Sequence, residues 1–301
     1  MIEYNLDGNI EKLNISEEKI NLCLGFFDGL HVGHKFLIQQ AKSPNAKLAV
    51  LTFEGSLKSI TQRRKEGLIT TVEDRKDFLS QLNVDFLYVI DFTKEIMQMD
   101  PVMFIEKFLK PLNINQIFVG EDFRFGQKAK GDVNLLKKYF DVQVVEYILD
   151  NGKKISTSTI IKYISDGEIK RANRLLGREY FIKGKVVHGF NAGAAKIGFP
   201  TANIELANNY VMPKKGVYAT RIEVNGKIYS SMTNIGIHPT INKLDSPTIE
   251  TNIFDRYLDI YDAPVKLYFV HFVRHEKKFK SVVKLKEQLF KDRENIKQLL
   301  D

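Results

Sequence analysis

The stretch GFFDGLHVGH, from Gly25 to His34, places an aspartate, two histidines and several glycines within ten residues. Glycines let backbone N–H groups approach a phosphate closely, and the N-terminus of a following helix adds a fixed positive potential. His31 and His34 are three residues apart, so both imidazoles face one side of a first helical turn and can donate to phosphate oxygens. The stretch therefore predicts an anion site that suits a triphosphate.

Other interpretations of this stretch are weaker. Its glycine spacing matches neither GxxxxGK[ST] nor GxGxxG, the two generic phosphate motifs. A zinc site would need a third ligand at close spacing, which the stretch does not supply. A glycine-rich turn with incidental histidines remains an alternative. Cys23, in the apolar run just before, is interpreted as a buried and inert thiol.

The elements around this stretch alternate between strand and helix patterns, which predicts an α/β domain with a parallel sheet covered by helices on both faces. Ligands bind at the carboxyl ends of the strands in such sheets, where the stretch falls. Residues 54–70 have no clear period and are expected to form a mobile or lid-like loop. Expected strands are 19–25, 47–53, 85–90, 116–119 and 142–148, and expected helices are 32–42, 72–82, 101–110 and 132–140.

The second half of the chain is expected to form a small antiparallel β-barrel with a C-terminal helix. Residues 155–176 read as two short helices, the second with Asp166 as N-cap and Gly177 as its stop. We place the boundary after them, giving domains 1–179 and 180–301. Consecutive short strands without intervening helices predict the barrel, and Asn225-Gly226 predicts a tight hairpin. The expected strands are 180–187, 216–224, 227–235, 247–254 and 264–274, and the helix is 281–300.

Composition is consistent with a folded protein of two domains. The chain has 301 residues, of which 44% are hydrophobic and 27% charged. It has no apolar run of membrane-spanning length and no secretory pattern, so we expect a cytoplasmic protein without a membrane partner. The formal charge of +8 favours anionic partners such as nucleotides or RNA, but the basic residues are scattered, which is typical of a solvated surface.

Residues Phe27 to His34 resemble the FDGxHxGH signature of the HxGH nucleotidyltransferases, in the form found in bacterial riboflavin kinase/FMN adenylyltransferases, also called FAD synthetases. Further segments resemble the same family in the same order. They are GEDFRFG at 120–126, ISTS at 155–158, LLGR at 175–178, GFPTAN at 198–203, NIGIHPT at 234–240 and Ile249-Glu250. The resemblance implies a Rossmann-like nucleotidyltransferase domain followed by a riboflavin kinase barrel, with ATP, riboflavin and FMN as small-molecule substrates and no nucleic acid.

For the first domain the resemblance implies attack of the FMN phosphate on the α-phosphorus of ATP, with pyrophosphate leaving. His31 and His34 would stabilise charge on the phosphates, and Asp28 would orient the nucleotide. The implied ATP-binding residues are Phe27, Gly29, Gly33, Ser156, Thr157 and Ser158, and the implied flavin-binding residues are Gly120, Asp122, Phe123, Arg124, Phe125 and Gly126.

For the second domain the resemblance implies that Glu250 is the general base on the ribityl 5′-hydroxyl of riboflavin. Thr201 and Asn203 would ligate Mg²⁺ beside the ATP phosphates. Arg274 is a further candidate flavin-binding residue. The implied ATP-binding residues are Gly193, Lys196, Gly198, Pro200, Thr201 and Asn203.

The sequence departs from the family pattern at three places. Ala192-Gly193 stands where an Arg-Gly pair is usual, and Lys196 is expected to supply the charge instead. Ile161 stands where the ISSTxxR segment ends in a phosphate-binding arginine, and TFEGSL at 52–57 replaces TFxPHP. Lys162 should point elsewhere, because one helical residue is about 100° of rotation. Three hypotheses remain: a bifunctional enzyme, a riboflavin kinase with a degenerate first domain, and a non-enzymatic flavin- or RNA-binding regulator.

Overall fold

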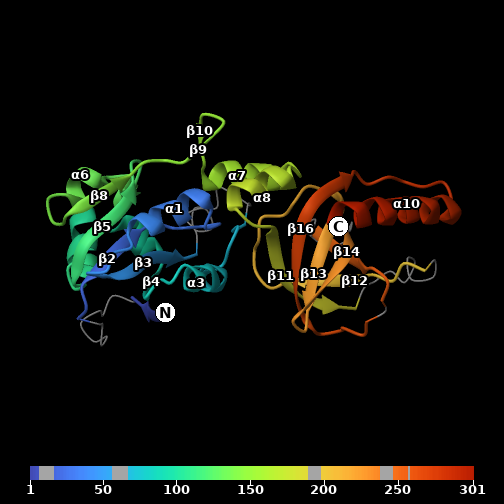
Figure 1. The fold of residues 1–301 in the computed structure, drawn as a ribbon, viewed down its shortest axis with the longest axis horizontal. Coiled ribbons are helices and arrows are strands. Elements are labelled where there is room, and N and C mark those ends of the chain that lie inside the picture. Colours follow the sequence, from blue (N-terminus) through green and yellow to red (C-terminus); the bar gives the residue numbers. More distant parts are fainter. Residues whose placement is uncertain (7–16, 56–66, 189–197, 238–246, 257) are drawn as a thin grey trace. The chain divides into compact units, whose positions relative to one another are not determined.

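The computed structural model describes residues 1–6, 17–55, 67–188, 198–237, 247–256 and 258–301, and Figure 1 shows their fold. The chain divides into two compact units, Met1–Thr157 and Ser158–Asp301. The sequence-based boundary at 179/180 lies further along the chain. Helix α8 (Ile169–Leu176) belongs to the second unit, because Asn173 donates a hydrogen bond of 2.8 Å to the Phe269 carbonyl and accepts one of 2.8 Å from the Tyr180 N–H.

The first unit is built on the parallel sheet that the sequence predicts. Its strands lie in the order β1 (Ile2–Asn5), β4 (Phe86–Asp91), β3 (Lys47–Glu54), β2 (Ile20–Leu24), β5 (Ile114–Gly120) and β8 (Val142–Val145). All five predicted strands form in this unit. Strand β1 is an addition, and its four residues are too few to give a readable period.

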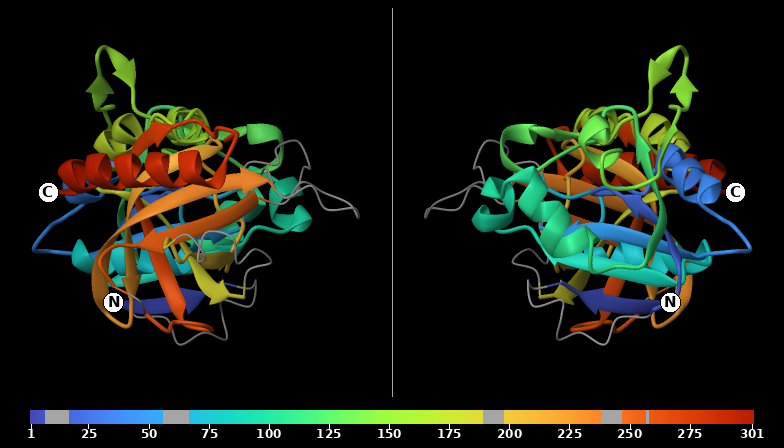
Figure 2. Two further views of the ribbon diagram at one scale, coloured as in Figure 1. Left: turned by 90° about the vertical axis from the view of Figure 1, so that its right-hand side faces the viewer. Right: turned by 90° about the vertical axis from the view of Figure 1, so that its left-hand side faces the viewer.

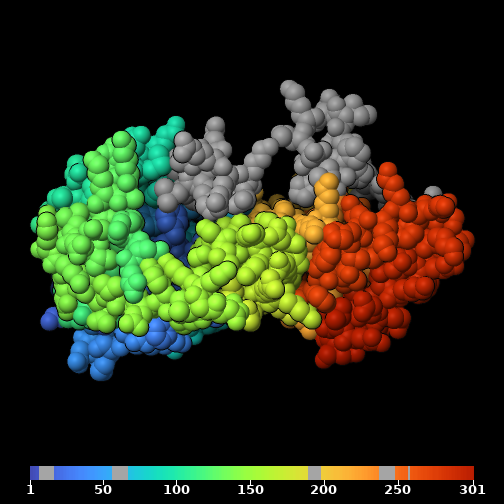
Figure 3. All heavy atoms as spheres, turned by 90° about the horizontal axis from the view of Figure 1, so that it is seen from above, coloured from blue at the N-terminus to red at the C-terminus, as the bar shows by residue number. Residues whose placement is uncertain are grey.

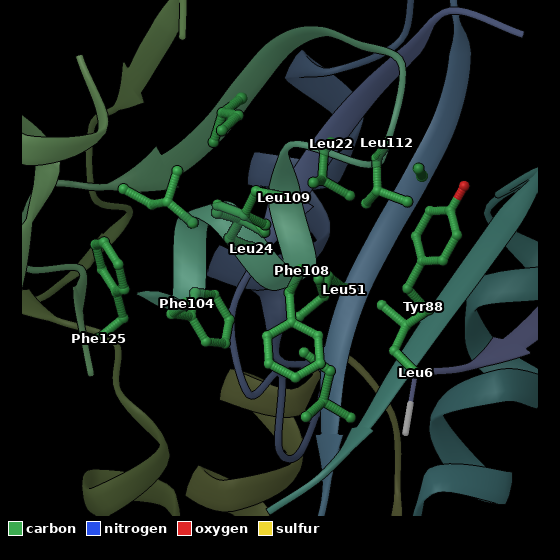
Figure 4. Packing of buried hydrophobic residues seen from close by; sticks show 14 of the residues in the cluster. Leu6, Leu22, Leu24, Leu51, Tyr88, Phe104, Phe108, Leu109, Leu112 and Phe125 are labelled. Atoms are coloured by element: carbon green, nitrogen blue, oxygen red, sulfur yellow. The ribbon is translucent and has the colours of Figure 1, made fainter. Parts of the chain in front are cut away.

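Strand residues alternate between the two faces of this sheet. Both faces carry buried apolar residues, and helices cover each of them. Leu22 and Leu24 of β2 pack on one face against helix α5 (Pro101–Phe104) and the π-helical turn η2 (Ile105–Leu109), as Figure 4 shows. Cys23 points to the opposite face, where helices α1 (Val32–Gln40) and α3 (Val72–Gln81) pack. Cys23 is fully buried, and burial raises the pKa of its thiol, which fits the expected inert role.

Short elements near the sheet edge differ from the expected ones. The expected helix 132–140 is helical only over α6 (Val133–Leu136), where Asp132 caps its start. Helix α4 (Lys94–Gln98) was not predicted. The remaining short elements are the hairpin of β6 (Arg124–Phe125) and β7 (Gly131–Asp132), the 3₁₀ turn η3 (Gln127–Ala129) and the hairpin of β9 (Leu149–Asp150) and β10 (Lys153–Lys154).

The second unit contains the predicted antiparallel barrel. It closes in the order β11 (Tyr180–Val187), β12 (Ala202–Leu206), β15 (Pro247–Ile253), β14 (Lys227–Ile237), β13 (Gly216–Val224) and β16 (Pro264–Arg274). Asn225 and Gly226 have φ of 51° and 72°, as the predicted hairpin requires. Strand β12 was not predicted. Figure 2 shows helix α10 (Val282–Leu300) along the barrel, and in the space-filling view the C-terminal residues, in red, lie next to the orange-red residues that precede them in the chain (Figure 3).

The two predicted helices between the sheet and the barrel are present as α7 (Thr157–Ser165) and α8. The predicted N-cap of α8 is wrong: the helix begins after Glu168, which makes no side-chain cap hydrogen bond. Gly167 has φ of 77°, so the chain reverses there, and the Glu168 N–H donates to the Tyr163 carbonyl instead. Gly177 adopts the left-handed conformation expected of a helix stop. Among the described residues, no helix is long and apolar enough to span a membrane.

Candidate functional sites

The order of the strands in the first unit places its candidate site. After β2, the chain continues to β3 on one side of β2 and later returns to β5 on the other side. Ligands of open parallel sheets bind where the strand order reverses in this way, at the carboxyl ends of the strands. The stretch 25–34 follows β2 and the stretch 120–126 follows β5, so the fold brings these two predicted binding segments to neighbouring strand ends.

The turn after β2 has an unusual backbone. Phe27, Gly29 and Leu30 have positive φ angles of 52°, 77° and 36°. Such angles are strained for Phe and Leu, but both side chains are buried, at 2% and 0% exposure. Their packing therefore holds the turn in shape, and Phe27, an expected ATP-binding residue, lies in the core cluster behind it.

His31 caps helix α1 with its own ring. Its Nδ1 accepts a hydrogen bond of 3.3 Å from the His34 N–H, which leaves Nε2 as the nitrogen that carries the proton in the neutral ring. The rings of His31 and His34 stack with their centroids 3.6 Å apart. A side chain at Gly33 would come within 3.2 Å of the His31 ring, so glycine permits this arrangement.

His34 is a neutral imidazole at physiological pH. Burial lowers its pKa well below the ordinary range, and electrostatic interactions with His31, Arg75 and Lys154 lower it further. Within the described part of the chain, its Nδ1 is buried without a hydrogen-bond partner. A neutral imidazole keeps one ring N–H, which can still donate to an anionic oxygen.

Asp28 fastens the turn to the segment that precedes helix α3. Its carboxylate accepts hydrogen bonds from the N–H groups of Ile69 and Thr70, at 3.1 and 2.9 Å, and from the Thr70 hydroxyl at 3.2 Å. Burial raises the pKa of Asp28, whereas the Thr70 N–H bond and the charge of Arg75 act in the opposite direction. Thr157 adds a bond of 3.2 Å to the Asp28 carbonyl. Asp28 thus shapes the turn that carries the histidines.

Arg75 of α3 is a buried cation that sequence reasoning missed. Its side chain is 1% exposed and donates to the carbonyls of Phe26, Phe53 and Thr71 and to the Thr52 hydroxyl. Burial lowers its pKa, and the charge of Asp28 is the largest influence that opposes the shift. The guanidinium therefore contributes a fixed positive charge below the turn. An arginine among polar helix residues gives no sequence signal of such a role.

A cavity of about 920 Å³ opens beside the turn. Its wall is mostly apolar and aromatic, with Phe26, Phe53 and Phe104 among its residues. The predicted flavin-binding residues Asp122, Phe123, Arg124, Phe125 and Gly126 all line this cavity, and Gly120 ends strand β5. The cavity has the size and character of a site for a large aromatic ligand.

The ISTS segment, with its predicted ATP-binding residues, leads into helix α7. Thr157 bonds to the turn, Ser156 is half-buried and Ser158 is exposed. Ile161 is buried at 3% exposure within α7, while Lys162 beside it is exposed, as helical geometry predicts. Position 161 is therefore a packing position and supplies no charge to a ligand.

The second unit has a cavity of about 320 Å³ that brings predicted residues together. Thr201 and Glu250 line it, as do Asn234, Asn252 and Arg274. Glu250 of β15 lies directly opposite Asn203 of β12 and Asn234 of β14. Directly opposed residues of antiparallel strands have Cβ atoms about 4.5–5.5 Å apart. The Glu250 carboxylate thus lies between two amide side chains on neighbouring strands, and the Thr201 hydroxyl lines the same cavity as Glu250 and Asn234, whereas Asn203 is not among the residues that line it.

The segment before β12 is held by a residue that the sequence did not point to. Asn252, two residues after Glu250 on the same strand face, donates a hydrogen bond of 2.7 Å to the Pro200 carbonyl. Phe199 is 2% exposed and packs edge-to-face on Phe290 of α10, with ring centroids 5.0 Å apart. Gly198 has φ of 86°. The predicted residues Gly193 and Lys196 lie outside the described residues.

Arg274 lines this cavity as part of a buried ion pair. Its Nε and Nη2 both donate to Asp292 Oδ2 of α10, at 2.8 and 2.6 Å. The side chains of Arg274 and Asp292 are 13% and 3% exposed, and Gln288 adds a bond of 2.8 Å to the same carboxylate. The pair fixes α10 beside the cavity and orients the guanidinium.

Comparisons with known proteins find matches to both units of the chain. A family model described as riboflavin kinase matches residues 176–300, and one described as FAD synthetase matches residues 14–159. Proteins named bifunctional riboflavin kinase/FMN adenylyltransferase are 38% identical in Bacillus subtilis and 31% identical in Escherichia coli K12. The alignments cover 93% of both chains for the first, and 92% of this chain and 91% of the relative for the second.

One solved structure also matches along the whole chain. It is from Streptococcus pneumoniae and is described as a macrolide-efflux protein, with 32% identity, a TM-score of 0.90 and 99% of each chain covered. The two family models, the relatives and the geometry of the two sites lead to one assignment. The chain belongs to the family of bifunctional riboflavin kinase/FMN adenylyltransferases.

Proposed function

We propose that the second unit phosphorylates riboflavin with ATP to give FMN, and that the first unit transfers AMP from ATP to FMN, giving FAD and pyrophosphate. The observation that carries the kinase activity is that Glu250 lines one cavity together with Thr201 and lies opposite Asn203 on the neighbouring strand. The adenylyltransferase activity rests on the histidine turn, which lies beside an aromatic cavity.

For the kinase step, Glu250 is the group that accepts the proton of the ribityl 5′-hydroxyl. As the proton leaves, the hydroxyl oxygen forms a bond to the γ-phosphorus of ATP, and the bond from that phosphorus to the bridging oxygen breaks to release ADP. Positioning and neutralisation of charge account for most of the rate in such transfers. Asn252 supports this positioning, because it holds the Pro200 carbonyl next to Thr201.

The oxygen donors at this cavity fit Mg²⁺. Thr201 and Asn203 supply neutral oxygens, and Glu250 lies opposite Asn203. Mg²⁺ prefers hard oxygen ligands and keeps water and substrate phosphates in its shell. Consistent with such a site, the described residues contain no cluster of three or more His, Cys, Asp or Glu side chains that would form an all-protein metal cage. Bound Mg²⁺ would neutralise charge on the ATP phosphates.

For the adenylyl step, an oxygen of the FMN phosphate attacks the α-phosphorus of ATP. The bond from that phosphorus to the bridging oxygen breaks, and pyrophosphate leaves with the electron pair. FMN phosphate is already an anion, so the step needs no protein base. His31 and His34 donate ring N–H groups to phosphate oxygens, and Arg75 adds a fixed positive charge below the turn.

The assay that tests this proposal is separation of flavins after incubation of the pure protein with riboflavin, ATP and Mg²⁺. Formation of FMN and then FAD supports both activities. FMN alone supports a kinase with an inactive first unit, which the buried Ile161 would explain. Absence of both products contradicts the proposal and favours a non-enzymatic flavin-binding role.

The role of Glu250 has its own prediction. Glu250→Gln removes the base but keeps the shape of the side chain, so FMN formation should fall about 10²–10⁴-fold. Glu205→Gln is the matched control, because Glu205 is an exposed carboxylate on β12, next to the same cavity strands. Rates of FMN formation measure the effect. Turnover by Glu250→Gln at the rate of the control would remove Glu250 from its assigned role.

A further inference from the structure

Lys154 lies beside the aromatic cavity of the first unit, three residues before Thr157, whose hydroxyl donates to the Asp28 carbonyl of the histidine turn. It is the last residue of β10, and its ammonium pairs with the carboxylate of Asp122, which lines the cavity. The same Nζ atom lies 3.7 Å from the ring centroid of Tyr147. Gly120, at the end of β5, lies next to this cluster, because a Cβ atom there would be in ordinary contact with Tyr147 and Asp122, at 3.5 and 3.7 Å.

The charge of Lys154 also acts at the other end of the site. Its positive charge is one of the influences that lower the pKa of His34, together with His31 and Arg75. Arg75 is buried and its donors are occupied by carbonyls and the Thr52 hydroxyl. The side chain of Lys154, in contrast, is 33% exposed and is held by flexible methylenes. The Lys154 ammonium can therefore leave the Asp122 carboxylate and bind an anionic ligand instead.

We propose that Lys154 binds phosphate oxygens at the point where the phosphates of ATP and FMN meet, moving from Asp122 to the ligand. This inference rests on the proposed adenylyl transfer. Attack of one phosphate on another brings negative charges together, and a cation within reach of both the turn and the cavity offsets this repulsion. Lys154 forms no covalent bond and transfers no proton in this role. Asp122 is a positioning residue that holds the ammonium at the cavity before substrates bind.

The phosphate bound by Lys154 can belong to ATP, to FMN or to both. Kinetics of FAD formation from FMN and ATP, with each substrate varied in turn, distinguish these sources. Loss of a contact to ATP alone raises the KM for ATP, and loss of a contact to FMN alone raises the KM for FMN. A contact that strengthens as the two phosphates join lowers kcat. We expect the fall in kcat, together with a smaller rise in one or both KM values.

The test uses Lys154→Ala and Lys154→Arg in the full chain. Lys153→Ala is the matched control, because neighbouring strand residues point to opposite faces and Lys153 lies opposite Asp150. Loss of a charged donor at a phosphate should lower kcat/KM for FAD formation by about 10²-fold in Lys154→Ala. Lys154→Arg should recover part of the rate, and Lys153→Ala should keep the rate of the unchanged protein. FMN formation from riboflavin should be the same in all variants.

A purely structural ion pair gives a different pattern. In that case Lys154→Ala and Asp122→Asn lower the rate of FAD formation by the same factor and lower the melting temperature by the same amount. Lys154→Arg then recovers the melting temperature but not the rate. That pattern overturns the inference, as does a rate within twofold of the unchanged protein in Lys154→Ala. If the unchanged protein forms FMN but no FAD, the proposed adenylyl transfer fails, and the role of Lys154 fails with it. If it forms FAD and Lys154→Ala forms FAD at a rate within twofold of it, only the inference fails.

Discussion

At the scale of single residues, the first site combines neutral donors with positive charges that are placed at different depths. His31 and His34 stack on each other, Arg75 lies buried below the turn, and Lys154 is within reach of solvent. A site of this kind favours a ligand that brings several negative charges. Burial of the His34 ring lowers its pKa most, and the charges of Arg75 and Lys154 act in the same direction, so this imidazole stays uncharged.

The lowered pKa of His34 predicts a pH dependence of stability. In the unfolded chain the residue titrates near 6.5, whereas in the folded chain its pKa is well below that value. Below about pH 6.5 the unfolded state therefore binds more protons, and the free energy of unfolding falls as the pH falls, by up to about 1.4 kcal/mol per pH unit. Chemical denaturation between pH 5 and 8 should show this slope in the unchanged protein and a smaller one in His34→Gln. Parallel curves would contradict the prediction.

Asn252 allows a second test at this scale. Asn252→Ala leaves the Pro200 carbonyl without its donor, which should cost about 1 kcal/mol of stability and displace Thr201 from the cavity. We expect the kcat/KM of FMN formation to fall about tenfold, because small misplacements of positioning groups have large effects on rate. The exposed Asn208 gives the control Asn208→Ala. Equal rates in both variants would show that this hydrogen bond does not support catalysis.

Residue types at short spacing could be predicted from the sequence, whereas contacts over long distances could not. The cavity in the second unit contains Thr201 and Glu250 as expected, and the larger cavity contains residues 122–126. Arg75, Lys154 and Asn252 were missed, because each acts through a partner on another element and its local sequence carries no pattern. Asp28 was a predicted site residue, but the contact of its carboxylate with Thr70 could not be predicted, because Thr70 lies on another element.

At the scale of elements, the long buried strands and the long C-terminal helix were predicted from the sequence, whereas two short strands were not. The buried strands β2, β3 and β4 are mostly apolar runs, and the helix α10 has apolar residues at helical spacing. Strands β1 and β12 have four and five residues, so their fold is set by their partners in the sheet and the barrel. Helix α8 begins later than predicted because Gly167 reverses the chain after Asp166.

The buried Asp292 of helix α10 is expected to contribute strongly to the stability of the second unit. Asp292→Ala leaves the Arg274 guanidinium without its carboxylate in a site that is 13% exposed, and breaking such a pair costs about 3–5 kcal/mol. Glu287→Gln breaks the exposed pair with Lys284 on the same helix and should cost at most about 1 kcal/mol. Unfolding by denaturant measures both values. Equal small losses would show that α10 does not depend on this pair.

At the scale of the whole molecule, each unit has its own core and its own candidate site. Phe199, Val217 and Ile296 belong to a core cluster of the second unit, and the two faces of the parallel sheet have separate clusters in the first. A substitution in one site should therefore leave the chemistry of the other unchanged. This independence separates a bifunctional enzyme from a kinase with an inactive partner unit.

The most direct measurement is product formation by two crossed variants, Glu250→Gln and His34→Gln, with riboflavin or FMN supplied in turn with ATP and Mg²⁺. Glu250→Gln should form FAD and an equal amount of pyrophosphate from FMN at the unchanged rate, but FMN from riboflavin about 10²–10⁴-fold more slowly. His34→Gln should form FMN normally and FAD about 10²-fold more slowly. Loss of both products in either variant, or an unchanged protein that never forms FAD, would contradict the account of two separate active sites.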